Sequence, residues 1–343
     1  MSAPDPFSDL LRQFVDSLAR TQAGIERAPH EREAMAAAVR DMLNRLVPAP
    51  PAAGETLAPG GVFRAGQTVA GVFTIVSLIN SGGMGELYRA RHRELNTDHA
   101  LKVLQVGWNA DPNAMALLRN EARLLLMVRH DAVVGGQGML RDSDGRPVLV
   151  MDFLRGPSLA RVLRNGPLDV PGVLALGRRM LAGLEALHAR GVVHGDISPA
   201  NIVLCDEQPG GATIVDLGVG RLLTEARGPH DDLDFAGKYA WVAPEQLDPH
   251  APADTRSDLY SLGLVLAAAA HEPLPMGADE VTARRQRVRI PPLDGVPAPL
   301  RPVLAQLLQP SPAGRPANAG AAAALLAGVE PARPRGLFRR SAS

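Results

Sequence analysis

Hydrophobic patterning divides most of the chain into a strand-rich part and a helical part. Short strand-like runs lie at 72–79 (VFTIVSLI), 85–92 (GELYRARH), 99–106 (HALKVLQV) and 147–153 (PVLVMDF). They predict a small sheet, and the helical spacing of apolar residues over 113–130 predicts one helix among the strands. Beyond Leu159 the pattern is mostly helical. We therefore expect an α+β fold with two lobes and a cleft between them.

Two further segments flank this region. Residues 1–47 carry apolar side chains at helical spacing and predict an N-terminal helical hairpin. Residues 48–61 read as a Pro/Ala/Gly-rich linker, and residues 332–343 as a basic tail. We interpret the hairpin as packing on its neighbour, with binding to a partner or a second copy as the alternative. A solvated tail is the preferred interpretation, and autophosphorylation at Ser341 or an electrostatic contact is the alternative.

Charge and cysteine content exclude several classes of protein. Positive and negative residues balance at 36 each, so no overall field favours nucleic acid as the partner. The single cysteine, Cys205, cannot form an intrachain disulfide and fits a reducing compartment. The start of the chain does not resemble a signal peptide. The apolar runs at 262–270 and 319–329 are too short to span a bilayer. We expect a cytoplasmic protein without a transmembrane segment.

Lysine is rare in this chain. It has 34 arginines but only two lysines, Lys102 and Lys238. A compact ammonium and a planar guanidinium are not interchangeable in a tight site. The two lysines therefore indicate positions where an ammonium is required.

A glycine-rich turn, NSGGMGELY (80–88), connects two of the predicted strands. A dinucleotide-binding crossover would instead open a helix after its glycines. A strand–turn–strand loop can fold over a triphosphate and offer it backbone N–H groups. By itself the pattern is also typical of an ordinary hairpin.

Lys102 lies in the middle of a predicted strand, where a buried ammonium needs a partner. Glu121, on the predicted helix, can supply that partner. An ordinary structural ion pair explains these two residues equally well.

Two polar loops follow in the helical half. HGDISPANI (194–202) places Asp196 and Asn201 five residues apart, and TIVDLGVG (213–220) places Asp216 at the end of an apolar strand. Carboxylate and amide oxygens suit Mg²⁺ that shares phosphate ligands. Asp196 is then available to orient or deprotonate an attacking hydroxyl.

These motifs, in this order, resemble the bacterial (Hanks-type) serine/threonine protein kinases over roughly residues 62–331. The resemblance implies a two-lobe kinase fold with an N-lobe at 62–153 and a C-lobe at 154–331. It implies ATP and Mg²⁺ (or Mn²⁺) as cofactors and a protein as the substrate, whose identity the sequence does not specify. Lys102, held by Glu121, would contact the phosphates, Asp196 would be the catalytic aspartate, and Asn201 and Asp216 would hold the metal. The nucleotide contacts implied by the resemblance are Ile79, Asn80, Ser81, Gly82, Gly83, Met84, Gly85, Leu87, Ala100, Lys102, Met151, Asp152, Leu154 and Val203.

The resemblance also implies two structural contacts in the C-lobe. The APE motif (243–245) is intact, and Glu245 is expected to pair with Arg315. Asp258, in DLYSLG (258–263), is expected to brace the catalytic loop.

Four residues depart from the family pattern: Asn80, Gly195, Ser198 and Lys238. Asn80 replaces the first glycine of the loop, and its tolerance of positive φ is expected to preserve the turn. Gly195 replaces the arginine that receives an activation-loop phosphate in the family. Only Thr224 and Tyr239 carry hydroxyls between Asp216 and Glu245, so we expect activity without loop phosphorylation.

Ser198 stands where serine/threonine kinases carry a lysine that neutralises the transferring phosphoryl group. Lys238 stands where they usually have a threonine that contacts that same lysine. We hypothesise that Lys238 acts as a catalytic residue that restores the missing charge; the alternative is a solvent-facing loop residue in a weak or inactive enzyme.

Two alternatives to a protein kinase remain. A nucleotide-binding pseudokinase that acts as a scaffold or regulator fits the four departures. A small-molecule phosphotransferase of the aminoglycoside-kinase type shares the HGD loop, but it lacks the APE segment and the DLYSLG helix.

Overall fold

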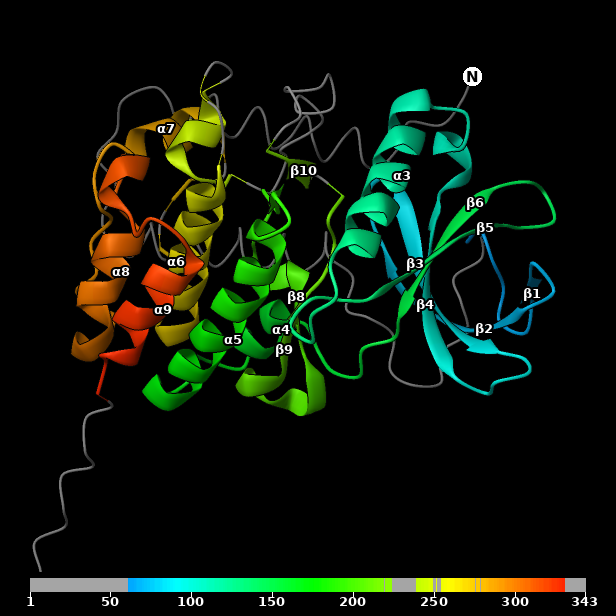
Figure 1. The fold of residues 1–343 in the computed structure, drawn as a ribbon, viewed down its shortest axis with the longest axis horizontal. Coiled ribbons are helices and arrows are strands. Elements are labelled where there is room, and N and C mark those ends of the chain that lie inside the picture. Colours follow the sequence, from blue (N-terminus) through cyan, green and yellow to red (C-terminus); the bar gives the residue numbers. More distant parts are fainter. Residues whose placement is uncertain are drawn as a thin grey trace, which may run out of the picture. The chain divides into compact units, whose positions relative to one another are not determined.

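The computed structural model describes residues 61–218, 220–223, 239–248, 251, 254–274, 276–277 and 279–330. These residues form a strand-rich N-lobe and a mainly helical C-lobe, as the α+β prediction requires (Figure 1). The predicted hairpin, nearly all of the linker, the basic tail and the residues Lys238 and Thr224 lie outside the described residues. The predictions made for them therefore stay predictions.

The N-lobe is built on one antiparallel sheet with the strand order β1-β2-β3-β4-β6-β5. Its strands are β1 (Thr68–Val69), β2 (Phe73–Ser81), β3 (Gly85–His92), β4 (Asp98–Leu104), β5 (Gly136–Arg141) and β6 (Pro147–Asp152). The strands predicted at 72–79, 85–92, 99–106 and 147–153 correspond to β2, β3, β4 and β6. Neither β1 nor β5 was predicted. β1 has only two residues, and β5 contains two glycines, which weaken any strand signal.

A single long helix, α3 (Pro112–Met127), packs beside the sheet. The Asp111 carboxylate caps its N-terminus by accepting hydrogen bonds from the backbone N–H groups of Asn113 and Ala114, and Pro112 occupies the first turn. The predicted helix over 113–130 is three residues too long at its C-terminal end. Val128 already has the extended dihedral angles φ −118° and ψ 129°, so the helix cannot continue through it.

The C-lobe is assembled from helices and two short strand pairs. The helices are α4 (Leu159–Leu163), α5 (Val170–His188), α6 (Thr255–Ala270), α7 (Glu280–Gln286), α8 (Arg301–Leu307) and α9 (Ala319–Ala327). The strand pairs are β7 (Val192–Val193) with β10 (Arg221–Leu222) and β8 (Ile202–Leu204) with β9 (Ala212–Ile214). Every residue from Ser257 to Ala270 of α6 is buried, so its apolar run is a core helix. None of the helices among the described residues has the length and apolar character needed to cross a membrane.

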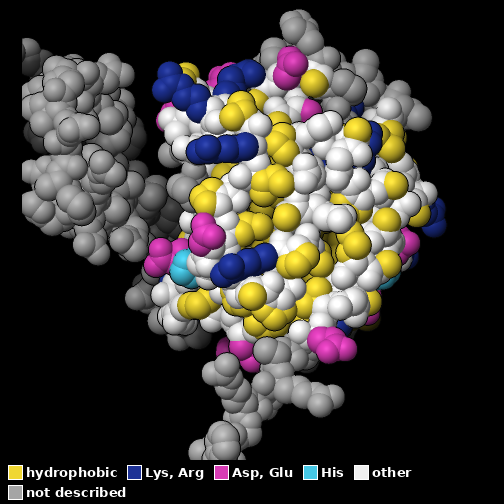
Figure 2. All heavy atoms as spheres, turned by 90° about the vertical axis from the view of Figure 1, so that its left-hand side faces the viewer, with side chains coloured by type: hydrophobic (Ala, Val, Ile, Leu, Met, Phe, Trp, Pro, Cys, Tyr) yellow, Lys and Arg dark blue, Asp and Glu magenta, His cyan; other side chains and the backbone are white. Residues whose placement is uncertain are grey.

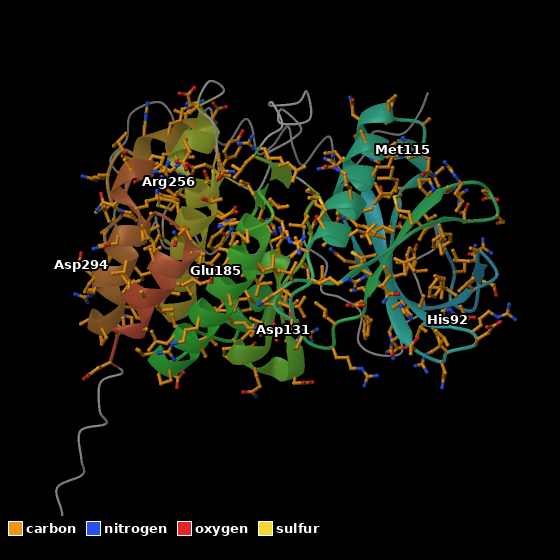
Figure 3. All side chains as sticks on the ribbon, in the orientation of Figure 1. His92, Met115, Asp131, Glu185, Arg256 and Asp294 are labelled. Carbon is orange, nitrogen blue, oxygen red and sulfur yellow. The ribbon has the colours of Figure 1, made fainter. Side chains whose placement is uncertain are left out.

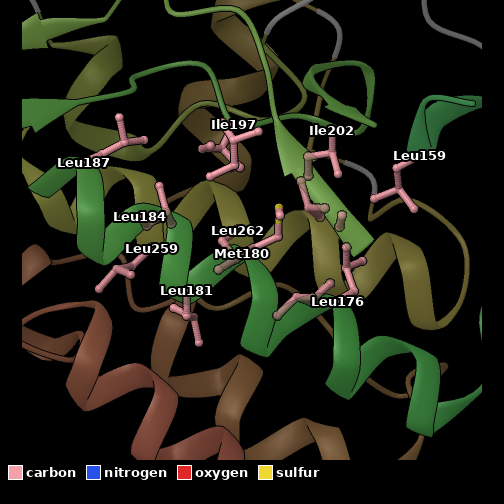
Figure 4. Close-up of a cluster of buried hydrophobic side chains, with 14 of the residues drawn as sticks. Leu159, Leu176, Met180, Leu181, Leu184, Leu187, Ile197, Ile202, Leu259 and Leu262 are labelled. Atoms are coloured by element: carbon pink, nitrogen blue, oxygen red, sulfur yellow. The ribbon is translucent and has the colours of Figure 1, made fainter. Parts of the chain in front are cut away.

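The largest core cluster lies beneath the polar loop at 194–202. Leu176, Met180 and other side chains of α5 pack against α6 there (Figure 4). Ile197 and Ile202, which are 1% and 0% exposed, insert into this cluster from the loop (Figure 4). Burying two large aliphatic side chains contributes about 3–6 kcal/mol of transfer free energy, which fixes the loop on the C-lobe.

The two lobes meet through the segment that contains Asp131, labelled in Figure 3. The backbone N–H of Val134 donates to the carbonyl of Ile214 at 2.9 Å, and the backbone N–H of Ile214 donates to the carbonyl of Ala132 at 2.8 Å. These bonds join the chain that leads into β5 to the strand that ends just before Asp216. The far end of the C-lobe mixes apolar patches with scattered arginines and carboxylates (Figure 2).

Candidate active site

The polar loop HGDISPANI is held from below by Asp258 of α6. Its buried carboxylate accepts the backbone N–H of His194 at 2.9 Å and that of Gly195 at 2.8 Å, and lies 2.8 Å from Nε2 of His188. Burial would raise the pKa of Asp258. The hydrogen bond and charge of His188, the charge of His194 and the Gly195 N–H outweigh burial and hold the pKa below its usual value. The predicted bracing contact is confirmed.

Gly195 has the backbone angle φ +74°. This left-handed region costs other residues free energy but is open to glycine. Glycine therefore lets the loop turn without strain between the braced backbone and Asp196.

Asp196 and Asn201 lie together at the top of this loop. The Asn201 amide donates from Nδ2 to the backbone carbonyl of Asp196 at 2.9 Å and to its carboxylate Oδ2 at 3.0 Å. Because the amide nitrogen is used in this way, the amide oxygen is the group that can serve as a metal ligand. The backbone N–H of Val215 donates to the Asn201 carbonyl at 2.9 Å, which brings Asp216 beside Asn201.

Lys102 of β4 connects both lobes at the cleft. Its Nζ lies 2.9 and 2.8 Å from the two carboxylate oxygens of Glu121 on α3, and 3.1 Å from Oδ1 of Asp216. Burial alone would lower the pKa of Lys102, but the carboxylates of Asp216 and Glu121 outweigh it and raise that pKa. The predicted ion pair with Glu121 is present, and the lysine also reaches Asp216, which the residues alone did not indicate.

Asp216 has a left-handed backbone, with φ +64°. Such a conformation costs a non-glycine residue about 1–3 kcal/mol and persists only where the surroundings hold it. Here Lys102 Nζ and the backbone N–H of Gly218, at 3.0 Å, both donate to its Oδ1, while the next side chain, Leu217, is fully buried. The Asp216 side chain is 44% exposed to solvent.

The glycine-rich turn is a hairpin between β2 and β3, as predicted. The N–H of Gly82 donates to the carbonyl of Gly85 at 2.9 Å, and a methyl group added at Gly83 would meet nothing within 4 Å. Asn80 lies in β2, where it pairs with Leu87, and it has no positive φ. The expectation that Asn80 preserves the turn by tolerating positive φ is therefore wrong, because its backbone is that of a strand.

Four of the predicted nucleotide contacts share one face of the sheet. Leu87 pairs with Lys102 across β3 and β4, and Ala100 pairs with Met151 across β4 and β6. Since Ala100 and Lys102 are two residues apart on one strand, all four side chains point to the same side. The remaining apolar positions, Ile79, Leu154 and Val203, are half-buried.

The backbone N–H of Asp152 is already used within the N-lobe. It donates to the carbonyl of Gly135 at 2.9 Å, and the Asp152 carboxylate accepts from Gln137 Nε2 at 2.6 Å. This N–H group is therefore not a donor to a nucleotide base in this conformation.

Ser198 is only 7% exposed and precedes a turn of 3₁₀-helix at Pro199–Asn201. Its carbonyl accepts the N–H of Asn201 at 3.0 Å, so position 198 lies in the same loop as Asp196. The structure does not test its relation to Lys238, which lies outside the described residues.

Sequence reasoning missed two glutamines that support the site. Gln105 donates from Nε2 to Ser81 Oγ at 3.2 Å and to the Gly82 carbonyl at 2.9 Å, and so braces the glycine-rich turn. Gln246 donates from Nε2 to the Gly195 carbonyl at 2.8 Å. In the sequence, only the position of Gln246 directly after APE could have indicated that it contacts the catalytic loop.

The chemistry of these groups fits a nucleotide and a divalent cation. An amide oxygen and a carboxylate from adjacent loops provide hard oxygen ligands. An ammonium held by two carboxylates, together with a turn that has open space at Gly83, suits a triphosphate. Glu245 also pairs with Arg315 as predicted, through bonds of 2.6 and 2.8 Å.

Comparisons with known proteins agree with this geometry. Residues 73–325 match the protein kinase domain family. The serine/threonine-protein kinase pkn2 of Myxococcus xanthus is 35% identical over 198 residues, which cover 57% of this chain and 24% of pkn2. The serine/threonine-protein kinase PknA of Mycobacterium tuberculosis is 30% identical over 285 residues, which cover 79% of this chain and 65% of PknA.

The crystal structure of the Mycobacterium tuberculosis PknI kinase domain has the same fold. It superposes with a TM-score of 0.60 at 25% identity, over 78% of this chain and 98% of that domain. The chain spans less than two thirds of the length of pkn2 and of PknA. The family match nevertheless covers most of its residues, and the chain belongs to the protein kinase domain family.

Proposed function

We propose that this chain is an ATP-dependent protein kinase that phosphorylates Ser or Thr hydroxyls of a protein substrate. The observation that carries the proposal is the position of Lys102, whose Nζ contacts Glu121 and Asp216 simultaneously. This contact joins the N-lobe sheet, α3 and the loop after β9 in one constellation. Asn201 and Asp196 lie in the neighbouring loop, linked by the Asn201 amide.

In the proposed arrangement the N-lobe binds ATP as a substrate. The face of the sheet that carries Leu87, Ala100 and Met151 takes the adenine, with Ile79, Leu154 and Val203 beside it. The backbone of residues 80–85 covers the phosphates, and Asp152 and Leu154 lie at the hinge. Lys102 orients the phosphates because the two carboxylates hold its ammonium in place.

The C-lobe then positions the acceptor. Asn201 and Asp216 would hold Mg²⁺, which supplies charge neutralisation on the phosphate oxygens when it is bound. The Asp196 carboxylate orients the acceptor hydroxyl and takes its proton as the new oxygen–phosphorus bond forms. The bond between the γ-phosphorus and the bridging oxygen breaks, and ADP leaves.

We further propose that activity does not require phosphorylation of the activation segment. The support is the backbone of Gly195, which two hydrogen bonds to Asp258 and Gln246 already fix. Glycine has no side chain with which to bind a phosphate. Lys238 would supply the positive charge that Ser198 lacks.

The test is incubation with labelled ATP and Mg²⁺, with a generic protein acceptor such as casein. Wild-type protein should transfer label to itself or to the acceptor, whereas Asp216→Ala should not. Asp294→Ala is the matched control, because Asp294 is an exposed aspartate at the far end of the C-lobe (Figure 3). Equal transfer by Asp216→Ala and wild type would contradict the proposal.

A nucleotide-binding pseudokinase is the second candidate. The observation that favours it is the short, nearly buried Ser198 two residues after Asp196, which leaves this loop without a lysine or an arginine. ATP binding by wild type without any label transfer would support this candidate over catalysis. A small-molecule phosphotransferase is less well supported, because the Glu245–Arg315 pair of the APE segment is formed.

A further inference from the structure

Arg287, directly after α7, is a buried cation that has no acidic partner among the described residues. It is 2% exposed and is among the largest of the fully buried side chains in the described residues. In the same part of the chain, no carboxylate lies within ion-pair distance of its guanidinium. Burial lowers its pKa, with only a small opposing effect from Tyr260. A buried charge of this kind is costly unless other polar groups compensate for it.

Backbone carbonyls provide the compensation. Nε donates to the carbonyl of Val242 at 2.7 Å, and Nη2 donates to that of Tyr239. Nη1 donates to the carbonyls of Met276 at 2.7 Å and Ala283 at 3.1 Å. The guanidinium therefore uses four hydrogen bonds to connect three stretches of chain: the segment before APE, the loop before α7 and α7 itself.

The fork of the guanidinium is what makes this arrangement possible. Arginine presents five N–H donors in a rigid plane, whereas a lysine ammonium presents three from one atom. An apolar side chain could fill the same volume but would leave three buried carbonyls and one part-buried carbonyl without this partner. The cost is about 1–3 kcal/mol for each buried carbonyl that finds no other partner. Filling this space would not require a charged side chain. The role of Arg287 is therefore to hold the backbone of the three connected stretches in one conformation through its hydrogen bonds.

The segment that Arg287 holds lies against the catalytic loop. Val242 is followed by APE and Gln246, and the Gln246 side chain donates to the Gly195 carbonyl, one residue before Asp196. The Ala243 N–H donates to the same side chain at 2.9 Å. A protein acceptor whose hydroxyl reaches Asp196 would therefore approach the Gln246 end of this segment.

We infer that Arg287 is a positioning residue for the protein acceptor: it fixes the backbone of residues 239–242 as part of the surface on which the acceptor binds. This inference rests on the proposed kinase function for its kinetic consequence. Its structural consequence, protection of this backbone segment, does not depend on catalysis.

The experiment compares Arg287→Met and Arg287→Lys with wild type by hydrogen–deuterium exchange and by kinetics. Amides of residues 239–248 should exchange at least about tenfold faster in Arg287→Met, while amides of α5 and α6 keep their protection. The KM for casein should rise about tenfold, whereas the KM for ATP should stay within about twofold. Arg287→Lys should fall between Arg287→Met and wild type, because it keeps the charge but loses the planar fork.

Two control variants test whether the effects come specifically from the guanidinium of Arg287. Tyr260→Phe removes a nearby buried hydroxyl that has no hydrogen-bond partner among the described residues, and it should change neither exchange nor KM. Arg289→Met removes an exposed arginine two residues away and should also be silent. If Arg287→Met does not fold, the same measurements on Arg287→Lys decide.

The outcomes separate this inference from the proposed function. Faster exchange confined to residues 239–248 supports the inference even if wild type transfers no phosphate, a result that would contradict only the kinase proposal. Unchanged exchange there would overturn the inference. Uniformly faster exchange through the C-lobe, with both KM values unchanged, would also overturn it and leave a purely structural role.

Discussion

The ion pairs Lys102–Glu121 and Arg315–Glu245 differ in how completely they are closed. Lys102 contacts two carboxylates, and its side chain remains 25% exposed at the cleft. The Arg315 side chain is 0% exposed and donates five hydrogen bonds, two of them to Glu245 and the others to the carbonyls of Gln309, Arg256 and Pro310. Its guanidinium also lies 4.7 Å from the centre of the Tyr260 ring.

This difference distinguishes the contact of Lys102, which we interpret as functional, from that of Arg315, which we interpret as structural. All five N–H donors of Arg315 are used within the protein, so it has none for a ligand. Lys102 is held between the lobes by two carboxylates. The phosphates of a nucleotide can compete for its ammonium, and a divalent cation can compete for the Asp216 carboxylate. The two ion pairs have similar lengths, but we expect different results when the cation is removed. Removal of Lys102 should mainly lower activity, and removal of Arg315 should mainly lower stability.

The largest effect is expected for Lys102→Met, measured as the rate of phosphoryl transfer. The rate should fall by at least about 10³-fold, because the phosphates lose their orienting charge. The unfolding free energy should fall by only about 1–2 kcal/mol. Burial raises the pKa of Glu121 even against the charge of Lys102, so that carboxyl can take up a proton when the lysine is removed.

The control for Lys102→Met is Arg91→Met, which removes a cation that pairs with Asp98 in the same sheet. It should leave the rate unchanged. A larger loss of stability than of activity in Lys102→Met would erase the distinction between the two ion pairs.

The next effect is expected for Arg315→Met, measured as the free energy of unfolding in urea. It should fall by about 3–5 kcal/mol, because Glu245 loses its buried partner. Arg315→Lys should recover only part of the loss, since an ammonium cannot reproduce the five-donor fork. Unchanged stability in Arg315→Met, with activity lost, would reverse the assignment of roles.

A third cation, Lys238, would sharpen the comparison if it acts at the cleft. Lys238→Ala should slow single-turnover transfer by about 10²–10³-fold with unchanged stability. Combining it with Ser198→Lys should restore part of the rate, because either lysine would neutralise the same phosphoryl group. Wild-type rates in Lys238→Ala would end the compensation hypothesis.

The smallest effect is expected for Thr224→Ala. The transfer rate should stay within about twofold of wild type, because Gly195 offers no cation to a phosphate on this segment. A large loss of activity with unchanged thermal unfolding would show that phosphorylation assembles the cleft.

Most of the site was predictable because its charged residues lie in short motifs with fixed spacing. Lys102, Glu121, Asp196, Asn201 and Asp216 were all identified from the sequence, and the structure brings them together. The fold followed from hydrophobic patterning, apart from strands whose glycines or short length give no pattern.

Apart from the contact between Lys102 and Asp216, the unpredicted contacts share one physical property: each includes a hydrogen bond to the backbone. Arg287, Gln105 and Gln246 donate to carbonyls, and every residue has a carbonyl, so no residue type indicates the partner. The backbone of Asn80 was mispredicted for a related reason, since its dihedral angles depend on strand pairing.

The position of Lys102 has a consequence for covalent inhibition. A reagent that acylates amines needs the neutral amine, and the two carboxylates keep this side chain as an ammonium ion by raising its pKa. A lysine-directed inhibitor would therefore react slowly with Lys102 unless it also displaced one of those carboxylates. Selectivity would be easier to achieve, because the chain has only one other lysine side chain to compete for the reagent.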